Sequence, residues 1–406
     1  MDRTESQPGR LHALDAVRGG ALLLGVGFHA SLSFLPGPQI WVVRDAADPV
    51  LGGFFIVSHM FRMTLFFVIA GFFGRMLLER RGTAGFVRDR GKRIVGPLLV
   101  FWPLILAGAI AAFVWGAAAM NGGALPTDSP PPPPLTVGTF PLTHLWFLYL
   151  LTWLYLAALA VRGVARLIDR KGWVAERIVD PALANAVSYG AACVLLAIPG
   201  FLALASSPGW VPAAGIPTPD MGLIPNKAAL AAYATAFFAG WLLHRQPLLL
   251  ERLARGWAIH LAGAVLLSGW ILWSRAGMPF FGTEADPMTR ILLAGAYMIA
   301  SWAWTLGLLG AAIRFLDAER RWVRYLADAS YWIYLLHLPV VMALQVAVFP
   351  LALPVLVKFA IVVTGASLIL LASYHLLVRR SFVGRWLNGR AYSRTAAKPA
   401  MEAQTA

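Results

Sequence analysis

Hydrophobic residues recur along the chain in about ten runs, each near the length that crosses a bilayer, and short polar segments separate them. The runs predict ten membrane-spanning helices. They cover 14–35, 50–78, 94–118, 141–161, 183–205, 228–243, 258–273, 291–313, 328–349 and 351–377. The sixth and seventh runs are short, which tilt or imprecise boundaries would explain. The expected fold is all-α, a polytopic membrane helical bundle.

Composition and charge agree with a membrane protein and predict its orientation. Hydrophobic residues make up 59% of the chain and charged residues only 13%, against about 25% charged in soluble proteins. Of the 34 Lys and Arg residues, 27 fall on one side of the predicted bundle. The other side has only Arg44, Lys227, Arg275 and Arg290. This bias predicts that both termini lie in the cytoplasm.

The net charge of +15 is thus a consequence of topology, and no nucleic-acid partner is expected. The spans leave no room for a soluble domain. We expect one transmembrane domain over 1–390 and a disordered cytoplasmic tail over 391–406. The first apolar run contains ionisable residues and is followed by no clear cleavage site, so it is expected to be an uncleaved anchor.

Two polar residues share one face of the first predicted span. Arg18 and His29 lie eleven residues apart, which is close to three helical turns and about 16 Å along the axis. Asp15 precedes Arg18 by one turn on the same face. A charge at membrane depth costs about 3 kcal/mol and usually faces a protein interior or cavity. The stripe indicates a polar-walled site. The alternatives are an Arg18 that only pairs with Asp15 and a packed, hydrogen-bonded His29.

Other spans bring further histidines to a similar depth. His59 and Arg62 are three residues apart on the second span, His144 begins the fourth, and His337 lies near the middle of the ninth. With the N-terminus inside, all of these positions fall at middle to outer depth. We expect His29, Arg62 and His337 to converge on one cavity in the outer half of the membrane. No metal is expected, because no compact ligand spacing occurs and carboxylates are scarce at that depth.

Three motifs together resemble a known family. Residues 14–20 (Leu-Asp-Ala-Val-Arg-Gly-Gly), followed by His29, resemble the signature of the acyltransferase-3 family of integral membrane acyltransferases. Residues 144–149 (His-Leu-Trp-Phe-Leu-Tyr) and 330–339 (Ser-Tyr-Trp-Ile-Tyr-Leu-Leu-His-Leu-Pro) resemble two further segments of that family. Residues 61–73 are similar to the branch containing the glucan biosynthesis protein C succinyltransferases. Thr64 stands where we expect proline in that branch, so the acceptor stays open.

The resemblance implies a multi-pass enzyme of a bacterial inner membrane. It would move a succinyl-type or acetyl-type group from cytoplasmic acyl-CoA to a hydroxyl of an envelope or periplasmic carbohydrate. Acyl-CoA would be the donor substrate, no cofactor would be bound permanently, and membrane lipids would surround the chain. Such a transfer needs a base for the hydroxyl proton and donors for an oxyanion. The expected catalytic residues are His29, His337 and Arg62, with His29 as the base.

Arg18, with Asp15, is expected to hold a phosphate of the donor. The expected substrate-binding residues are His59, His144, Trp146, Tyr149, Ser330 and Tyr334. Structural alternatives stay open, namely interhelical contacts for the histidines and aromatic packing for Trp146 and Tyr149. A different class of function is also open, because the same residues could line the path of a transporter or flippase for a polar or anionic solute.

Overall fold

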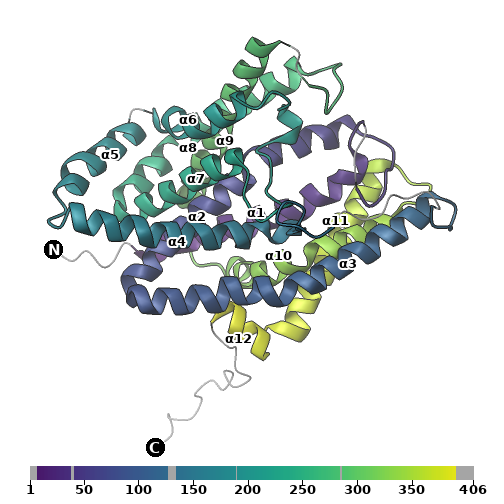
Figure 1. Ribbon diagram of the computed structural model, residues 1–406, viewed down its shortest axis with the longest axis horizontal. Coiled ribbons are helices and arrows are strands. Elements are labelled where there is room, and N and C mark those ends of the chain that lie inside the picture. Colours follow the sequence, from purple (N-terminus) through teal and green to yellow (C-terminus); the bar gives the residue numbers. More distant parts are fainter. Residues whose placement is uncertain (1–6, 38–40, 127–133, 189, 284–285, 390–406) are drawn as a thin grey trace, which may run out of the picture.

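The computed structural model describes residues 7–37, 41–126, 134–188, 190–283 and 286–389. This part of the chain contains no strand, and its only β feature is a bridge between Pro141 and Met221. Most of the long helices run parallel or antiparallel along the horizontal axis of Figure 1. The predicted all-α membrane bundle is therefore confirmed. The predicted tail, 391–406, lies outside the described residues.

A helix stands at the position of each predicted span. In chain order the helices are α1 (Gln7–Ser31), α2 (Pro49–Arg90), α3 (Gly96–Met120), α4 (Trp146–Ile168), α5 (Asp180–Ser188), α6 (Ala192–Ala205), α7 (Lys227–Arg245), α8 (Leu248–Ser274), α9 (Pro287–Phe315), α10 (Arg321–Val348), α11 (Val355–Ser373) and α12 (Phe382–Asn388). Among the described residues, seven helical stretches are long and apolar enough to cross a membrane, or up to eight if α5 and α6 count as one. One of the seven, Pro49–Met120, contains both α2 and α3. The alanine-rich α7, which ends on His244 and Arg245, is not among them.

Capping residues and glycines determine where these helices begin and break. The carboxylate of Asp48 accepts hydrogen bonds from the first backbone N–H groups of α2, and a proline follows it in the first turn. Gly82, at φ +65°, breaks the long stretch, and α3 returns antiparallel to α2. Accordingly Gly116, near the end of α3, lies against Val42, just before α2. The span expected over 183–205 is not one straight helix, because α5 and α6 meet at 102° beside Gly190, whose φ is +70°.

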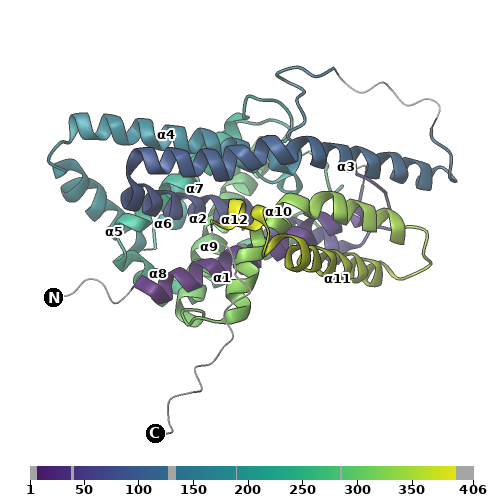
Figure 2. The ribbon, with the colours of Figure 1, turned by 90° about the horizontal axis from the view of Figure 1, so that it is seen from below.

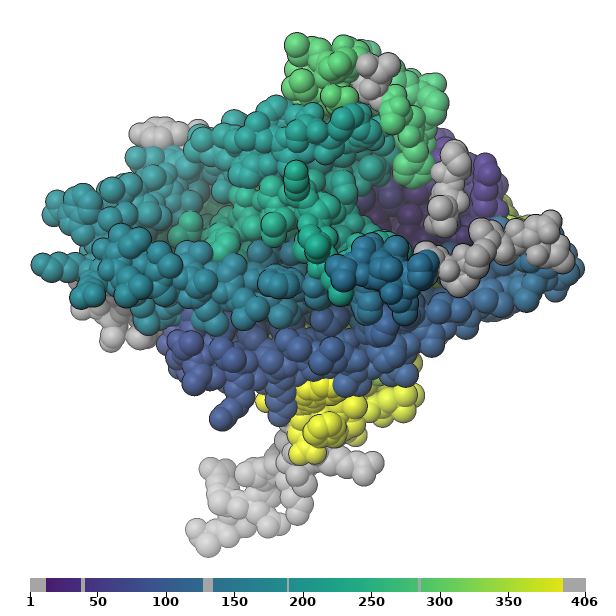
Figure 3. Space-filling view, viewed as in Figure 1, coloured from purple at the N-terminus to yellow at the C-terminus, as the bar shows by residue number. Residues whose placement is uncertain are grey.

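The central helix is α1, which contacts α2, α9, α10 and α11. Figure 2 shows α3 and α4 in one layer at the top, with α10 packed directly below α3 and α11 below α10. In Figure 3 the blue, teal and green segments cover most of this face, and purple N-terminal residues appear only behind them toward the right. Helices α2 and α7 approach closely at Gly71 and Gly240, where a Cβ on either glycine would overlap the backbone of the other helix. Small residues thus allow α2 and α7 to pack with their backbones in close contact.

Candidate active site

One cavity of about 1050 Å³ runs between α1, α2, α4 and α10. On α1 it is lined from Asp15 to His29, a length of about 21 Å at 1.5 Å per residue. That is most of the roughly 30 Å hydrocarbon thickness of a bilayer. The residues near one end are Arg18, Arg90, Arg93 and Asp328, and those near the other are Trp41, Thr143 and Asp220. We call these the basic end and the histidine end, because the histidines lie nearer the second.

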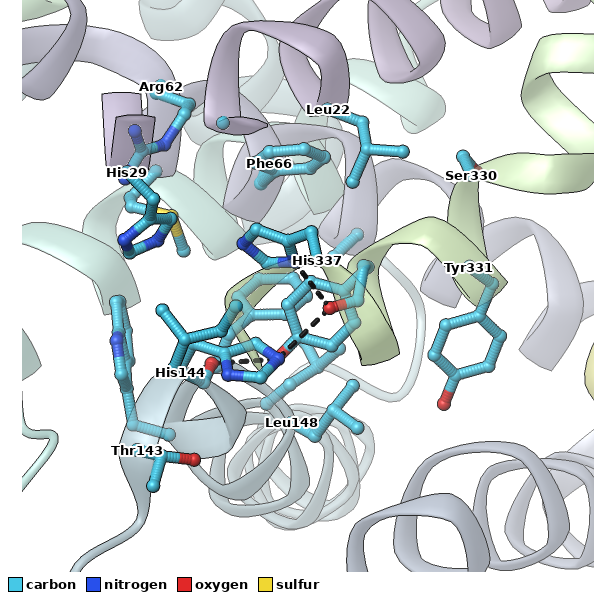
Figure 4. A pocket seen from close by; sticks show the side chains of 18 of the residues that line it. Leu22, His29, Arg62, Phe66, Thr143, His144, Leu148, Ser330, Tyr331 and His337 are labelled. Atoms are coloured by element: carbon cyan, nitrogen blue, oxygen red, sulfur yellow. Dashed lines mark hydrogen bonds between the residues drawn. The ribbon is translucent and has the colours of Figure 1, made fainter. Parts of the chain in front are cut away.

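Three imidazole rings from three helical segments meet in this cavity. The ring centroids of His29 and His337 are 5.1 Å apart, and those of His337 and His144 are 4.8 Å apart. Figure 4 shows His337 between the other two, with Arg62 beside His29. The predicted convergence of His29, Arg62 and His337 on one cavity is therefore confirmed. Their depth in the membrane stays a prediction.

Backbone carbonyls of α10 fix the orientation of two of these rings. Nδ1 of His337 donates to the carbonyl of Tyr334 at 2.7 Å, so Nε2 of the neutral ring keeps its lone pair. Nε2 of His144 donates to the carbonyls of Tyr334 and Leu335 at 3.0 and 3.2 Å. The carbonyl of Leu335 is available because Pro339, four residues later, has no N–H. The Tyr334 hydroxyl donates in return to the His144 carbonyl at 2.8 Å, which joins the start of α4 to α10.

His29 is held through its backbone rather than its ring. The carbonyl of His29 accepts a hydrogen bond from the side chain of Gln345 at 3.1 Å. The same side chain accepts one from the indole of Trp41 at 2.9 Å. The Trp41 ring lies nearly parallel to the His29 ring, with centroids 6.0 Å apart, whereas Nδ1 of His29 is buried without a partner. Sequence reasoning missed Gln345 and Trp41, and the one available signal was a glutamine in an apolar run.

Arg62 is a buried cation with no acidic partner among the described residues. Only 6% of it is exposed, and its guanidinium lies 3.7 Å over the ring of Phe28. Its Nη1 atom is buried without a hydrogen-bond partner. His59, one turn earlier, is also buried and also has an unpartnered Nδ1. A buried charge without a counterion is destabilising, so this part of the cavity is suited to an anionic or strongly polar ligand.

At the basic end, three arginines pair with two of the acids. Arg18 pairs with Asp15 at 3.1 Å, Arg90 with Asp89 at 2.6 Å, and Arg93 with Asp89 at 3.5 Å. The ion pair between Arg18 and Asp15, which was the structural alternative for Arg18 expected from the sequence, is thus present. Even so, the Arg18 side chain is 35% exposed and lines the cavity. Arg90 and Arg93 were counted only as loop charges, although their spacing of one helical turn could have indicated a shared face.

The remaining predicted residues divide by where their polar atoms point. Trp146 lines the cavity but stacks on Tyr233, with ring centroids 5.5 Å apart. Ser330 also lines it, while its hydroxyl donates to a carbonyl of its own helix. Tyr149 is not a lining residue, and its hydroxyl donates to the carbonyl of Leu223 at 2.8 Å. The cavity therefore gathers every predicted site residue except Tyr149. The described residues contain no cluster of three or more potential metal ligands.

A helical membrane bundle with a histidine cluster inside a cavity that opens toward arginines has the parts of an integral membrane acyltransferase. The profile of the acyltransferase-3 family, described as an acyltransferase domain, matches residues 11–377. The chain belongs to this family, as its motifs predicted.

Among the similar proteins is glucans biosynthesis protein C of Escherichia coli strain SMS-3-5, which is 33% identical over 145 residues. The match covers 35% of this chain and 36% of that protein. The proteins of the same name from strains K12 and O1:K1 are each 32% identical over 145 residues, with the same coverage. The match thus spans about a third of the length of these relatives. No solved structure matches the chain.

Proposed function

We propose that this protein moves an acyl group of the succinyl or acetyl type from cytoplasmic acyl-CoA to a hydroxyl of an envelope or periplasmic carbohydrate. The observation that carries the proposal is one cavity that joins an arginine-lined end to a histidine cluster about 16 Å away along α1. Membership of the acyltransferase family supports the reaction. The name of the similar proteins, glucans biosynthesis protein C, supports a carbohydrate acceptor.

The basic end suits the phosphates of the donor. Guanidinium groups bind phosphate through two parallel hydrogen bonds, and Arg18, Arg90 and Arg93 present three of them around one opening. Their acidic partners hold the side chains in place before a donor arrives. The thin pantetheine arm would then extend along α1. The separation of about 16 Å between Arg18 and His29 is of the order needed to bring the thioester to the histidines.

The chemistry follows from the groups at the histidine end. His29 takes the proton of the acceptor hydroxyl, and the oxygen forms a bond to the thioester carbonyl carbon. Arg62 stabilises the oxyanion that results. Collapse of this intermediate breaks the carbon–sulfur bond, and the leaving CoA thiolate takes the proton from His29. His337 supports the step. The centroid of its ring lies 5.1 Å from that of His29, and its Nε2 keeps a lone pair that can accept a hydrogen bond from the protonated His29.

Arg62 also bears on the identity of the acyl group. A succinyl group carries a free carboxylate, which would supply the counterion that Arg62 lacks among the described residues. An acetyl group has no such carboxylate, so Arg62 would then interact only with the oxyanion. Purified protein should therefore be compared with succinyl-CoA and acetyl-CoA as donors at matched concentrations.

Orientation is part of the proposal. The 27-to-4 bias of basic residues supports a cytoplasmic location for both termini, and with them for the basic end of the cavity. A reporter that functions only in the cytoplasm should be active when it is fused after Ala406. Activity of a reporter that works only in the periplasm would contradict this orientation.

A transporter or flippase is the second candidate, since a cavity that runs between two ends also suits a solute path. Purified protein in detergent, given labelled acyl-CoA, separates the two functions. The enzyme releases free CoA only when an acceptor is present, whereas a transporter releases none. Mass spectrometry of envelope glycans from cells with and without the gene would then identify the acceptor.

A further inference from the structure

Two segments far apart in sequence close the histidine end of the cavity. The backbone N–H of Leu142 donates to the carbonyl of Asp220 at 2.8 Å, and that of Gly222 donates to Phe140 at 2.9 Å. This pairing surrounds the bridge between Pro141 and Met221. It brings residue 220 beside the start of the segment that carries Thr143 and His144. The loop before α7 therefore forms part of the wall next to the histidine cluster.

Thr143 has a backbone conformation that its side chain disfavours. Its φ is +53°, and among the described residues it is the one residue other than glycine with a positive φ. Its Oγ1 atom is buried and has no hydrogen-bond partner, although the residue lines the cavity. Figure 4 shows it directly beside His144. Strained residues with unsatisfied polar atoms persist where they serve a ligand.

Asp220 lines the same end and differs from the acids of the basic end. Its side chain is exposed to the cavity, and Thr218 donates to its carboxylate at 3.3 Å. No Lys or Arg lies within ion-pair distance of it in the described part of the chain. A carboxylate only accepts hydrogen bonds and offers about four acceptor positions. Adjacent hydroxyl groups of a sugar are donors that match such a group.

We propose that Thr143 and Asp220 form the acceptor subsite, in which they bind hydroxyl groups of a neutral carbohydrate and hold the reacting hydroxyl against His29 and His337. The inference rests on the proposed function and adds which residues select the acceptor. A negative carboxylate at this end repels anionic sugars. It also repels the donor phosphates, which keeps the two substrates at opposite ends of the cavity.

The test measures the acceptor KM of purified protein with saturating acyl-CoA and a mixture of neutral glucose oligosaccharides. Asp220→Ala and Thr143→Val should each raise the acceptor KM by about tenfold, because each removes a hydrogen bond to the sugar. The donor KM should change less than about twofold. Thr143→Ser keeps the hydroxyl and should restore the acceptor KM. Glu319→Gln and Thr152→Val are matched controls, since neither residue lines the cavity.

Thr143→Gly adds a readout that a purely structural role would not give. Glycine adopts positive φ without strain, so this variant should unfold at a higher temperature while its acceptor KM rises as in Thr143→Val. An unchanged acceptor KM in Thr143→Val and Asp220→Ala, with the wild-type protein active, would overturn the subsite. Absence of acceptor-dependent CoA release by the wild-type protein would instead overturn the proposed function.

Discussion

The two ends of the cavity hold similar residue types but satisfy them differently. At the basic end Arg18, Arg90 and Arg93 each form an ion pair with Asp15 or Asp89, although Nε of Arg18 and Nε of Arg90 are buried without a hydrogen-bond partner. At the histidine end several buried polar atoms have no partner, namely Nδ1 of His29, His59 and His144, Nη1 of Arg62 and Oγ1 of Thr143. Buried polar groups without partners cost free energy that a bound ligand can offset. Both ends therefore contain unpartnered polar atoms, but in the described part of the chain the arginine charges of the basic end have acidic partners and the charge of Arg62 at the histidine end has none.

This difference predicts that changes at the histidine end reduce turnover and that changes at the basic end reduce donor affinity. It also predicts opposite effects on stability. Removing an ion pair at the basic end loses a native contact, whereas removing an unpaired buried group at the histidine end relieves a cost.

The largest effect is expected for His29→Ala. Loss of the base should lower turnover by about 10²- to 10⁴-fold while donor affinity stays near wild type, because proton transfer and donor anchoring occur at different ends. Acyl transfer and CoA-analogue binding are measured on the same folded sample. His375→Ala, an exposed histidine outside the cavity, is the control. Turnover of His29→Ala at the wild-type rate would end the assignment of the base.

Arg62→Met should come next, with a loss of turnover of about 10²- to 10³-fold from the missing oxyanion partner. Its thermal unfolding midpoint should rise, because methionine fills the space without an unpaired buried charge. Arg314→Met, at an exposed position outside the cavity, provides the comparison. A variant that both unfolds earlier and turns over normally would show that Arg62 is a packing residue.

Arg18→Ala should weaken donor binding by about tenfold, and Arg18→Lys by less, because lysine keeps the charge without the planar fork. Turnover at saturating donor should stay near wild type. Asp15→Asn removes the partner that holds the guanidinium in place, so it should weaken donor binding by less than Arg18→Ala does. Arg324→Ala removes a comparable surface ion pair outside the cavity. Equal donor affinity in wild type and Arg18→Ala would exclude the phosphate clamp.

Tyr149→Phe is expected to have the smallest effect, under about twofold on the acceptor KM, because its hydroxyl already donates to the backbone of the loop before α7. Acceptor titration at saturating donor measures it. A loss comparable to that of Asp220→Ala would return Tyr149 to the acceptor site.

The sequence predicted which residues share the cavity because helical spacing defines a face. Positions 15, 18 and 29 fall on one stripe of α1, and the cost of exposing such groups to lipid directs that stripe inward. The positions of the helices were predictable for a similar reason, since bilayer thickness fixes the length of an apolar run.

Features that depend on tertiary contacts were not predictable. The bend between α5 and α6 depends on the turn at Gly190, inside an otherwise apolar run. Thr143 follows a residue whose backbone is hydrogen-bonded to residue 220, and no local sequence pattern indicates this contact. Gln345 contacts His29 and Trp41 across more than 300 residues of sequence.

The central claim is that donor and acceptor enter one cavity from opposite sides of the membrane. The most direct test places protein in sealed vesicles with a neutral glucan encapsulated and impermeant labelled acyl-CoA outside. Molecules whose basic loops face outward should transfer label to the encapsulated glucan, and His29→Ala protein should not. Transfer that requires both substrates in the same compartment would contradict the account.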